Sequence, residues 1–208
     1  MLPPTIPIFP LPNVVLFPNV FLPLHIFEPR YRAMTADALS GDRIIGMTLL
    51  QPGYQADYER RPPVYPIGCA GVITHSEPLP DGRYNIVLRG IEKFRIDSED
   101  DSRSYRQAHI TALPETTSEE DRRLLSQQRL RLEAVLASAI ERGGAEPRFP
   151  PAIGDEDLVN ALAQYLDLQA IERQALLECQ GVLERERALI ELLEMRMLAP
   201  GGHLGGIH

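Results

Sequence analysis

Residues 67–96, IGCAGVITHSEPLPDGRYNIVLRGIEKFRI, decide the fold of the first half of the chain. Two runs rich in β-branched residues, Cys69–Glu77 and Arg83–Leu88, flank a Pro-Asp-Gly tripeptide at residues 80–82. Proline, aspartate and glycine favour a tight turn between antiparallel strands. The stretch therefore predicts a β-hairpin.

More short strands are predicted on both sides of this hairpin. Gly90 interrupts the second run and indicates a bulge before a strand at Glu92–Ile96. Arg43–Leu50 and Tyr105–Leu113 have the same β-rich composition, whereas the acidic stretch Asp97–Asp101 is typical of a loop. A count of about six short strands favours a closed or pseudo-barrel sheet.

The first 30 residues combine many prolines with strongly apolar residues. Because proline lacks an amide hydrogen, this pattern predicts extended edge segments rather than central strands. A small helix is predicted next: it begins at Glu28-Pro29, with a proline suited to a first turn, and ends at Ser40-Gly41. Residues 51–66, QPGYQADYERRPPVYP, are too polar and too broken for regular structure and predict a long surface loop.

After residue 115 the chain is dominated by leucine, alanine, glutamate and arginine at helical spacing. Four helices are predicted: three begin near Ser118, Asp155 and Val182, and a short one is centred on Ile171, Ala175 and Leu176. We therefore expect an α+β protein, with a β domain over residues 1–115 and an all-α helical bundle over 116–208. We expect a flexible C-terminal tail after Leu198.

The composition argues against several classes of protein. An apolar fraction of 44% is typical of a globular chain, and a net charge of −8 makes a nucleic-acid partner unfavourable, although a local basic patch would still allow one. No window is long and apolar enough for a membrane span, and the start lacks the basic region of a signal peptide. Two distant cysteines, Cys69 and Cys179, suggest reduced thiols. We expect a cytoplasmic protein with no membrane partner.

No catalytic or metal-binding motif is recognisable. His75 and Ser76 are neighbours on one predicted strand and point to opposite faces, so they cannot form a base–nucleophile pair. The histidines lack metal-ligand spacing, and the run at 97–101 lacks the glycine and glutamate of a calcium loop. We expect no enzyme activity, no catalytic residues, no metal and no cofactor.

The run LPLHIFEPRYRAM at residues 22–34, preceded by IPIFPLPNVVLFP, resembles the N-terminal substrate-binding domain of Lon-type ATP-dependent proteases. Residues 67–96 and the later stretch DEDLVNALAQYLDLQAIERQALLE are similar to the same family, so that the resemblance spans roughly residues 6–198. It implies a PUA-like pseudo-barrel followed by a helical bundle.

The resemblance also implies a function: binding of unfolded or extended polypeptide, as an adaptor or accessory to ATP-dependent proteolysis by a separate protease. The sequence contains no GxxxxGK[ST] phosphate loop, so nothing would hold ATP phosphates. Its one lysine, Lys93, lies in the β domain and cannot supply the lysine of a Ser-Lys protease dyad. We therefore expect a recognition module without an ATPase or protease.

Two segments are candidates for the binding surface. The first combines aromatic residues with a polar cluster suited to gripping a peptide, and the same polar residues have a structural interpretation as helix-capping and backbone-bonding groups. Its members are Phe17, Phe21, His25, Phe27, Glu28, Arg30 and Tyr31. The second is the predicted loop, with residue types favoured at binding hot spots: Tyr54, Tyr58, Arg60, Arg61 and Tyr65.

Two other functions remain open. RNA binding is the main alternative, because the resemblance implies a PUA-like barrel and such barrels elsewhere recognise RNA. The tyrosines and arginines of the predicted loop could also stack on single-stranded bases. A small hydrolase is a third reading, and it would require convergent acid–base groups that the sequence does not show. The sequence leaves the partner's identity and the oligomeric state open.

Overall fold

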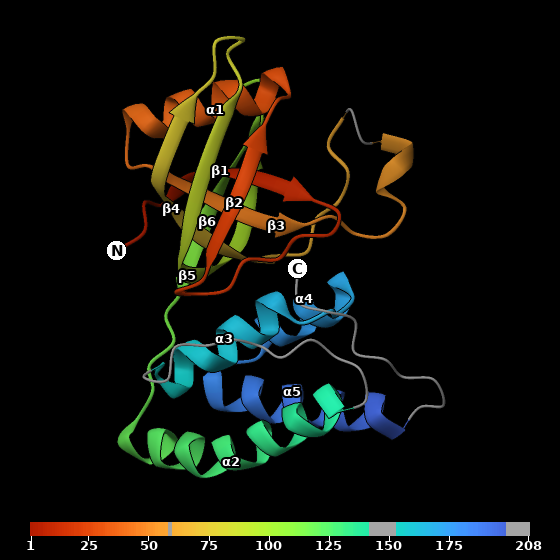
Figure 1. The fold of residues 1–208 in the computed structure, drawn as a ribbon. Helices are drawn as coiled ribbons and strands as arrows, with labels where there is room; N and C mark the ends of the chain where they lie inside the picture. Colours follow the sequence, from red (N-terminus) through yellow and green to blue (C-terminus); the bar gives the residue numbers. More distant parts are fainter. Residues whose placement is uncertain (58–59, 142–152, 199–208) are drawn as a thin grey trace. The chain divides into compact units, whose positions relative to one another are not determined.

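The computed structural model describes residues 1–57, 60–141 and 153–198, and the chain divides into two units, Met1–Pro114 and Glu115–His208 (Figure 1). The first unit holds the strands and one α-helix, and the second holds four helices. The predicted α+β class is confirmed. The predicted C-terminal tail lies outside the described residues. None of the helices in the described ranges is long and apolar enough to cross a membrane.

The strands of the first unit form one sheet that closes on itself. The strand order is β2-β5-β4-β3-β1-β6, and an additional pairing joins β6 to β5. Five strands therefore make a closed barrel, while β2 is attached to β5 alone. The bounds are β1 Thr5–Leu11, β2 Phe21–Ile26, β3 Ile44–Leu49, β4 Ile67–Pro78, β5 Tyr84–Asp100 and β6 Arg106–Leu113.

Strand β5 is longer than predicted. It runs through the acidic stretch Asp97–Asp100, for which a loop was expected, because Ser98–Asp100 pairs with Gln107–His109 of β6. The hydroxyl of Thr111 in β6 donates to the carboxylate of Asp97 across this pairing. The prediction of a loop there was wrong, since charge does not prevent pairing on the exposed face of a sheet.

Gly90 is the bulge that the sequence predicted. The β4–β5 register shifts at this point, where Ala70 pairs with Glu92 and Gly71 pairs with Gly90. The amide of Gly90 donates to the carbonyl of Val20, and the amide of Asn19 donates back to Gly90. A Cβ atom at Gly90 would lie 2.0 Å from the carbonyl oxygen of Phe17. Only glycine permits this close approach of two backbones.

Strand β1 is not the edge segment that its prolines predicted. It lies between β3 and β6, antiparallel to β6 through Thr5–Ile8 and parallel to β3 through Ile8–Leu11. The two ladders overlap only at Ile8, so Pro7 and Pro10 each have a paired strand on one side alone. A proline nitrogen is tolerated where it faces an unpaired side, which reconciles the prolines with an interior position.

The helix α1, Pro29–Ser40, begins and ends where the sequence predicted and runs across the strands of the β unit (Figure 1). It buries Tyr31, Met34, Thr35 and Ala38. The predicted loop after β3 contains a short 3₁₀ helix, η1, at Tyr54–Asp57. Val64 near the end of this loop forms an isolated β-bridge with Leu50, which directly precedes the loop.

The second unit is built around its last helix. The helices are α2 Glu119–Glu141, α3 Asp155–Tyr165, α4 Ala170–Glu178 and α5 Val182–Leu198, and α5 contacts the other three. The hydroxyl of Ser118 caps α2 by accepting the amide of Asp121, whose carboxylate accepts the amide of Ser118 in return.

Two charged residues of α5 are buried among leucines. Arg185 is fully buried and binds the carboxylate of Glu115, with a shortest contact of 2.5 Å, as well as the side-chain oxygen of Asn160 and the carbonyl of Leu176. Its charge is thus compensated. Glu186 is only 1% exposed, and its Oε2 has no hydrogen-bond partner among the described residues. Burial raises the pKa of Glu186 to about 7.

We predict that Gly90→Ala destabilises the β unit by at least about 2 kcal/mol, because the new methyl group would meet the backbone of Phe17. The measurement is chemical denaturation followed by near-ultraviolet circular dichroism. Gly41→Ala is the matched control, since its Cβ would lie no closer than 3.6 Å to its nearest neighbour. Equal denaturation midpoints for the two variants would contradict the close packing at Gly90.

We also predict that the helical unit loses stability as the pH rises. The unfolded chain releases the Glu186 proton near the ordinary pKa of 4.5, whereas the folded chain holds it to about 7. The stability that this proton contributes is therefore present below about 4.5 and is lost as the pH rises through about 7.

Urea unfolding monitored by helical circular dichroism should show this loss, about 2 kcal/mol between about pH 5 and about pH 8. Glu186→Gln should reduce the pH dependence, and Glu191→Gln, an exposed glutamate on the same helix, should leave it unchanged. An unchanged profile in Glu186→Gln would refute the assignment.

Candidate functional site

Strand β2 lies at the open edge of the sheet, and its hydrogen-bond register leaves proline at that edge. The amide of Gly90 donates to Val20, so the alternation of an antiparallel ladder places Leu22, Leu24 and Ile26 in the hydrogen-bonded pairs with β5. Pro23 then occupies a non-bonded pair, with its nitrogen toward the open edge. An added strand could not form an uninterrupted ladder here, so any recognition at β2 must use side chains.

The side chains of Phe21, Pro23, His25 and Phe27 make an exposed row, which we call the β2 face. All four are exposed, while the alternate residues Leu22, Leu24 and Ile26 are partly or fully buried. Phe21 and Phe27 are 50% and 60% exposed. In the described parts of the chain, they are the two aromatic members of the exposed large hydrophobic residues.

A polar row runs across three strands beside these aromatics. Nδ1 of His25 donates to Oδ1 of Asn85 at 2.7 Å, and Nδ2 of Asn85 donates to Oε2 of Glu77 at 2.9 Å. The guanidinium of Arg83 lies 3.1 Å from Nε2 of His25. A histidine tautomer with its proton on Nδ1 satisfies both contacts. The His25 ring also stacks near Phe27, with centroids 6.2 Å apart.

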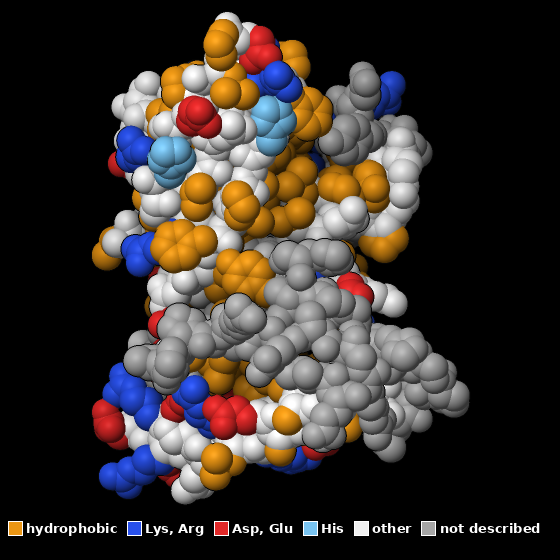
Figure 2. Space-filling model, viewed as in Figure 1, with side chains coloured by type: hydrophobic (Ala, Val, Ile, Leu, Met, Phe, Trp, Pro, Cys, Tyr) orange, Lys and Arg blue, Asp and Glu red, His pale blue; other side chains and the backbone are white. Residues whose placement is uncertain are grey.

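The surface of the β unit therefore mixes apolar and polar groups. Figure 2 shows hydrophobic side chains interspersed with histidine and charged side chains on the face that β2 presents in Figure 1. Such a face can bury apolar side chains of a partner while its polar atoms satisfy the partner's backbone.

Some residues of the first predicted segment do not reach the surface. Phe17 is fully buried, and Tyr31 is 4% exposed and packs on Phe9 with ring centroids 4.3 Å apart. Including Phe17 in a binding surface was wrong, because its side chain belongs to the core. Glu28 is the N-cap residue of α1 but makes no side-chain capping bond, and its carboxylate pairs with Arg30 at 3.0 Å.

Two residues of the second predicted segment, Arg60 and Arg61, lie close to the first segment. Tyr58 lies outside the described residues, while Tyr54 and Tyr65 are half-buried. Arg60 and Arg61 are exposed, and they line a pocket that Arg30 also lines. The structure thus joins the two predicted segments through their arginines, although 30 positions separate these residues in the sequence.

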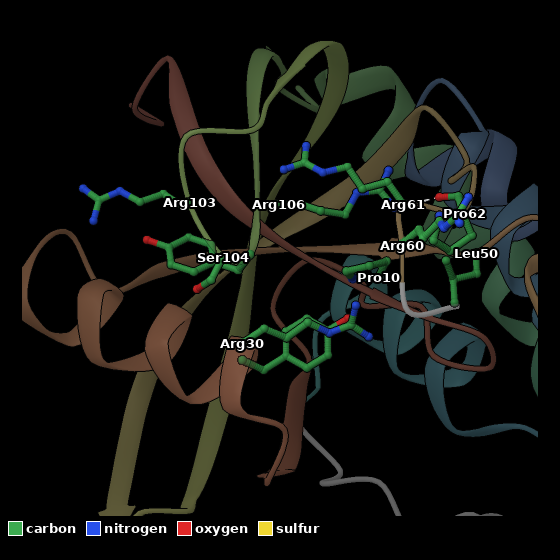
Figure 3. Close-up of a pocket in the computed structure, with 11 residues that line it drawn as sticks. Pro10, Arg30, Leu50, Arg60, Arg61, Pro62, Arg103, Ser104 and Arg106 are labelled. Carbon is green, nitrogen blue, oxygen red and sulfur yellow. Dashed lines mark hydrogen bonds between the residues drawn. The ribbon is translucent and has the colours of Figure 1, made fainter. Parts of the chain in front are cut away.

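We call this cavity the arginine pocket; its volume is about 240 Å³ (Figure 3). Its arginines come from the first turn of α1 (Arg30), the loop before β4 (Arg60 and Arg61), the β5–β6 turn (Arg103) and the start of β6 (Arg106). The Arg103 side chain points away from the others (Figure 3). The remaining lining residues are Pro10, Tyr31, Leu50, Pro62, Ser104 and Tyr105. The prediction from the sequence missed Arg103 and Arg106, which follow the acidic run 97–101 that was interpreted as a loop.

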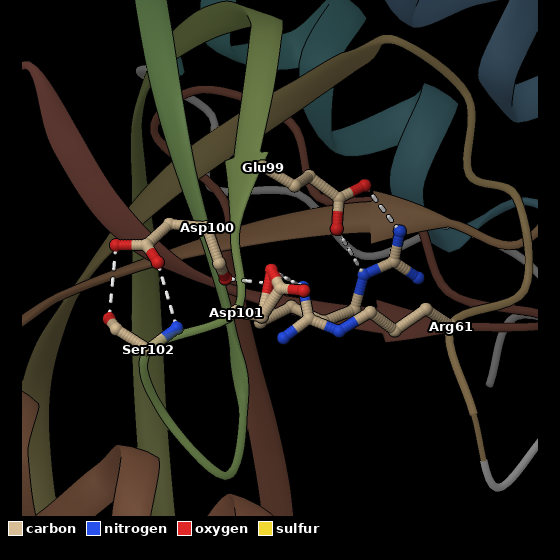
Figure 4. Close-up of polar contacts among 6 residues, drawn as sticks. Arg61, Glu99, Asp100, Asp101 and Ser102 are labelled. Atoms are coloured by element: carbon tan, nitrogen blue, oxygen red, sulfur yellow. Dashed lines mark hydrogen bonds and ion pairs between the residues drawn. The ribbon is translucent and has the colours of Figure 1, made fainter.

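Carboxylates outside the pocket hold these arginines in place. Glu99 binds Arg106 through both oxygens, at 2.5 and 2.7 Å (Figure 4). The carbonyl of Pro62 accepts a third bond from Arg106. Arg61 donates to the carbonyl of Asp100 at 3.1 Å and lies 3.6 Å from the carboxylate of Asp101.

Two further contacts stabilise the turn that carries this pocket. The carboxylate of Asp100 accepts the amide of Ser102 at 2.7 Å, which lowers the pKa of Asp100 (Figure 4). The hydroxyl of Tyr105 donates to Asp37 at 2.7 Å, and burial together with this bond raises the pKa of Tyr105 to about 12. Asp37 also pairs with Arg103 at 3.3 Å.

Over residues 1–57, 60–141 and 153–198, no group of three or more His, Cys, Asp or Glu side chains is arranged to hold a metal ion. Among the described residues neither cysteine forms a disulfide; Cys69 is buried and Cys179 is partly buried. His75 is exposed.

A family comparison matches nearly the whole chain. The family model of the ATP-dependent protease La (LON) substrate-binding domain matches residues 5–195. A Lon protease of Flavobacterium johnsoniae is 29% identical over 204 residues, which cover 94% of this chain and 24% of that protein. A Lon protease 2 of Syntrophobacter fumaroxidans is 30% identical over 179 residues, which cover 85% and 22%. The chain thus spans about a quarter of the length of the curated relatives that it matches.

Solved structures show the same fold at lower sequence identity. A Lon N-terminal domain protein from Xanthomonas campestris superposes with a TM-score of 0.60 at 21% identity, over 91% of this chain and 97% of that one. The N-terminal domain of a Mycobacterium avium complex Lon protease superposes with a TM-score of 0.58 at 18% identity, over 91% and 98%.

Proposed function

This chain belongs to the ATP-dependent protease La (LON) substrate-binding domain family, and we propose that it is a non-catalytic module that binds unfolded or extended polypeptide. The observation that carries the proposal is the family match over residues 5–195. The absence of a GxxxxGK[ST] motif from the sequence supports a role without ATP hydrolysis. We propose further that the module delivers polypeptide to a separate protease.

The β2 face supports the proposal, because it exposes two phenylalanines that can contact a polypeptide. Packing of exposed phenylalanines on apolar side chains of a partner removes apolar surface from water, which favours binding. Folded proteins bury most such side chains, whereas unfolded chains expose them, so the surface would select unfolded polypeptide. Phe21 and Phe27 supply the aromatic anchors, and His25 and Asn85 supply polar atoms between them.

Pro23 limits backbone pairing between the β2 edge and other extended chains. An edge strand that offered a continuous row of amides would pair with any extended chain, including a second copy. Since Pro23 has no amide, the β2 edge discourages that pairing, and the proposed recognition uses side chains and tolerates varied sequences.

We predict that the double variant Phe21→Ser, Phe27→Ser binds a permanently unfolded model polypeptide at least about tenfold more weakly than the unmodified protein, because it loses both anchors. The measurement is fluorescence anisotropy of the labelled polypeptide. The matched control is Leu130→Ser, which removes an exposed hydrophobic side chain (74% exposed) from α2 in the other unit. Its affinity should be unchanged.

Two results would count against the proposal. If the unmodified protein shows no saturable binding up to high micromolar concentration, the module does not bind unfolded polypeptide. If Leu130→Ser weakens binding as much as the double variant does, the β2 face is not the binding surface. Circular dichroism of each variant checks that folding is retained.

A further inference from the structure

The arginine pocket is positive on an acidic chain. Five of its eleven lining residues are arginines and none is an aspartate or glutamate, whereas the whole chain carries a net charge of −8. Guanidinium groups repel one another, so a cluster of this kind is costly unless anions neutralise it. The pocket is therefore lined by basic residues although the chain as a whole is acidic.

Four of the pocket's arginines form ion pairs with carboxylates that lie outside the pocket lining. These carboxylates belong to Glu28, Asp37, Glu99 and Asp101. Arg106 is 7% exposed and fixed by three hydrogen bonds, so its orientation is set before any ligand arrives. Preorganised donors of this kind reduce the entropy cost of binding.

Arg60 is the arginine left for a ligand. Among the described residues it has no hydrogen-bond or ion-pair partner, and it is exposed at the wall of the pocket. The first turn of α1, which carries no acidic residue, adds the positive end of a helix dipole through Arg30 and Tyr31.

The size of the cavity favours a single anionic group over a cofactor. A volume of about 240 Å³ is below the range of about 300–1,000 Å³ typical of sites for drug-sized molecules. Guanidinium forks match the two oxygens of a carboxylate, which one aspartate or glutamate side chain supplies.

The pocket also adjoins the β2 face along the chain. Arg30 follows Phe27 by three residues, so their Cα atoms are at most about 11 Å apart. A segment of a few residues could therefore place an apolar side chain on Phe27 and a carboxylate in the pocket. RNA would need a longer basic track to neutralise successive phosphates, and the chain's acidity opposes one.

We propose that the arginine pocket binds the carboxylate of an acidic residue that follows an apolar segment in the bound polypeptide. This inference rests on the proposed function, and it specifies the class of polypeptide that the module prefers: apolar residues followed closely by aspartate or glutamate.

The test compares two labelled peptides that differ in one feature. Both contain the same aromatic segment, followed in one by a pair of glutamates and in the other by a pair of glutamines. The glutamate peptide should bind about tenfold more tightly, the effect of a charge-assisted hydrogen bond. Arg60→Gln should abolish the difference, whereas Arg95→Gln, an exposed arginine of β5 outside the pocket, should preserve it.

The outcomes separate this inference from the proposed function. Equal affinity of both peptides for the unmodified protein overturns the inference and leaves polypeptide binding intact. Failure of both peptides to bind overturns the proposed function. Tighter Arg60-dependent binding of a single-stranded RNA than of the glutamate peptide assigns the pocket to phosphate and overturns the carboxylate. Arg60→Glu should weaken the glutamate peptide more than Arg60→Gln does.

Discussion

The β unit depends on one strand that is shared by three neighbours, and on one glycine that lets a second backbone approach it. Strand β5 pairs with β4 along most of its length, with β2 through its first half and with β6 through its second half. The bulge at Gly90 separates the two halves, and the backbone of Phe17 occupies the space that a side chain would fill. The barrel closes because β5 is long enough to change partners, and β2 stays attached because Gly90 has no Cβ.

The surface follows from the same arrangement. Strands β4 and β6 pair with β5 inside the closed barrel, whereas β2 pairs with β5 alone and lies at an edge. The side chains of Phe21, Pro23, His25 and Phe27 are exposed at this edge. Proline at that edge prevents indiscriminate pairing through the backbone and leaves the aromatic side chains available. The turn between β5 and β6 brings Arg103 and Arg106 beside Arg30, Arg60 and Arg61, which places a positive pocket next to an apolar face.

The helical unit shows a different use of charge. Arg185 of α5 is buried and compensated by Glu115, Asn160 and the carbonyl of Leu176, so one side chain ties together the start of the unit, α3, α4 and α5. Its neighbour Glu186 lacks such compensation and keeps its proton to about pH 7. Leu183 of the same helix is only partly buried, while Arg185 and Glu186 are both buried. Helical periodicity predicts an amphipathic helix, but it does not show that two charged side chains lie on the buried face.

The sequence by itself determined the element types, the Pro-Asp-Gly turn, the bulge at Gly90, the bounds of α1 and the family. These depend on local chemistry: proline fixes φ, glycine permits close approach, and side-chain periodicity marks an amphipathic element. Only the tertiary structure decided that β1 lies inside the sheet, that Asp97–Asp100 is paired, that Phe17 is buried and that five arginines meet in one pocket. Each of these depends on which segments become neighbours, and that is set by the closure of the barrel over long sequence distances rather than by any residue and its immediate neighbours.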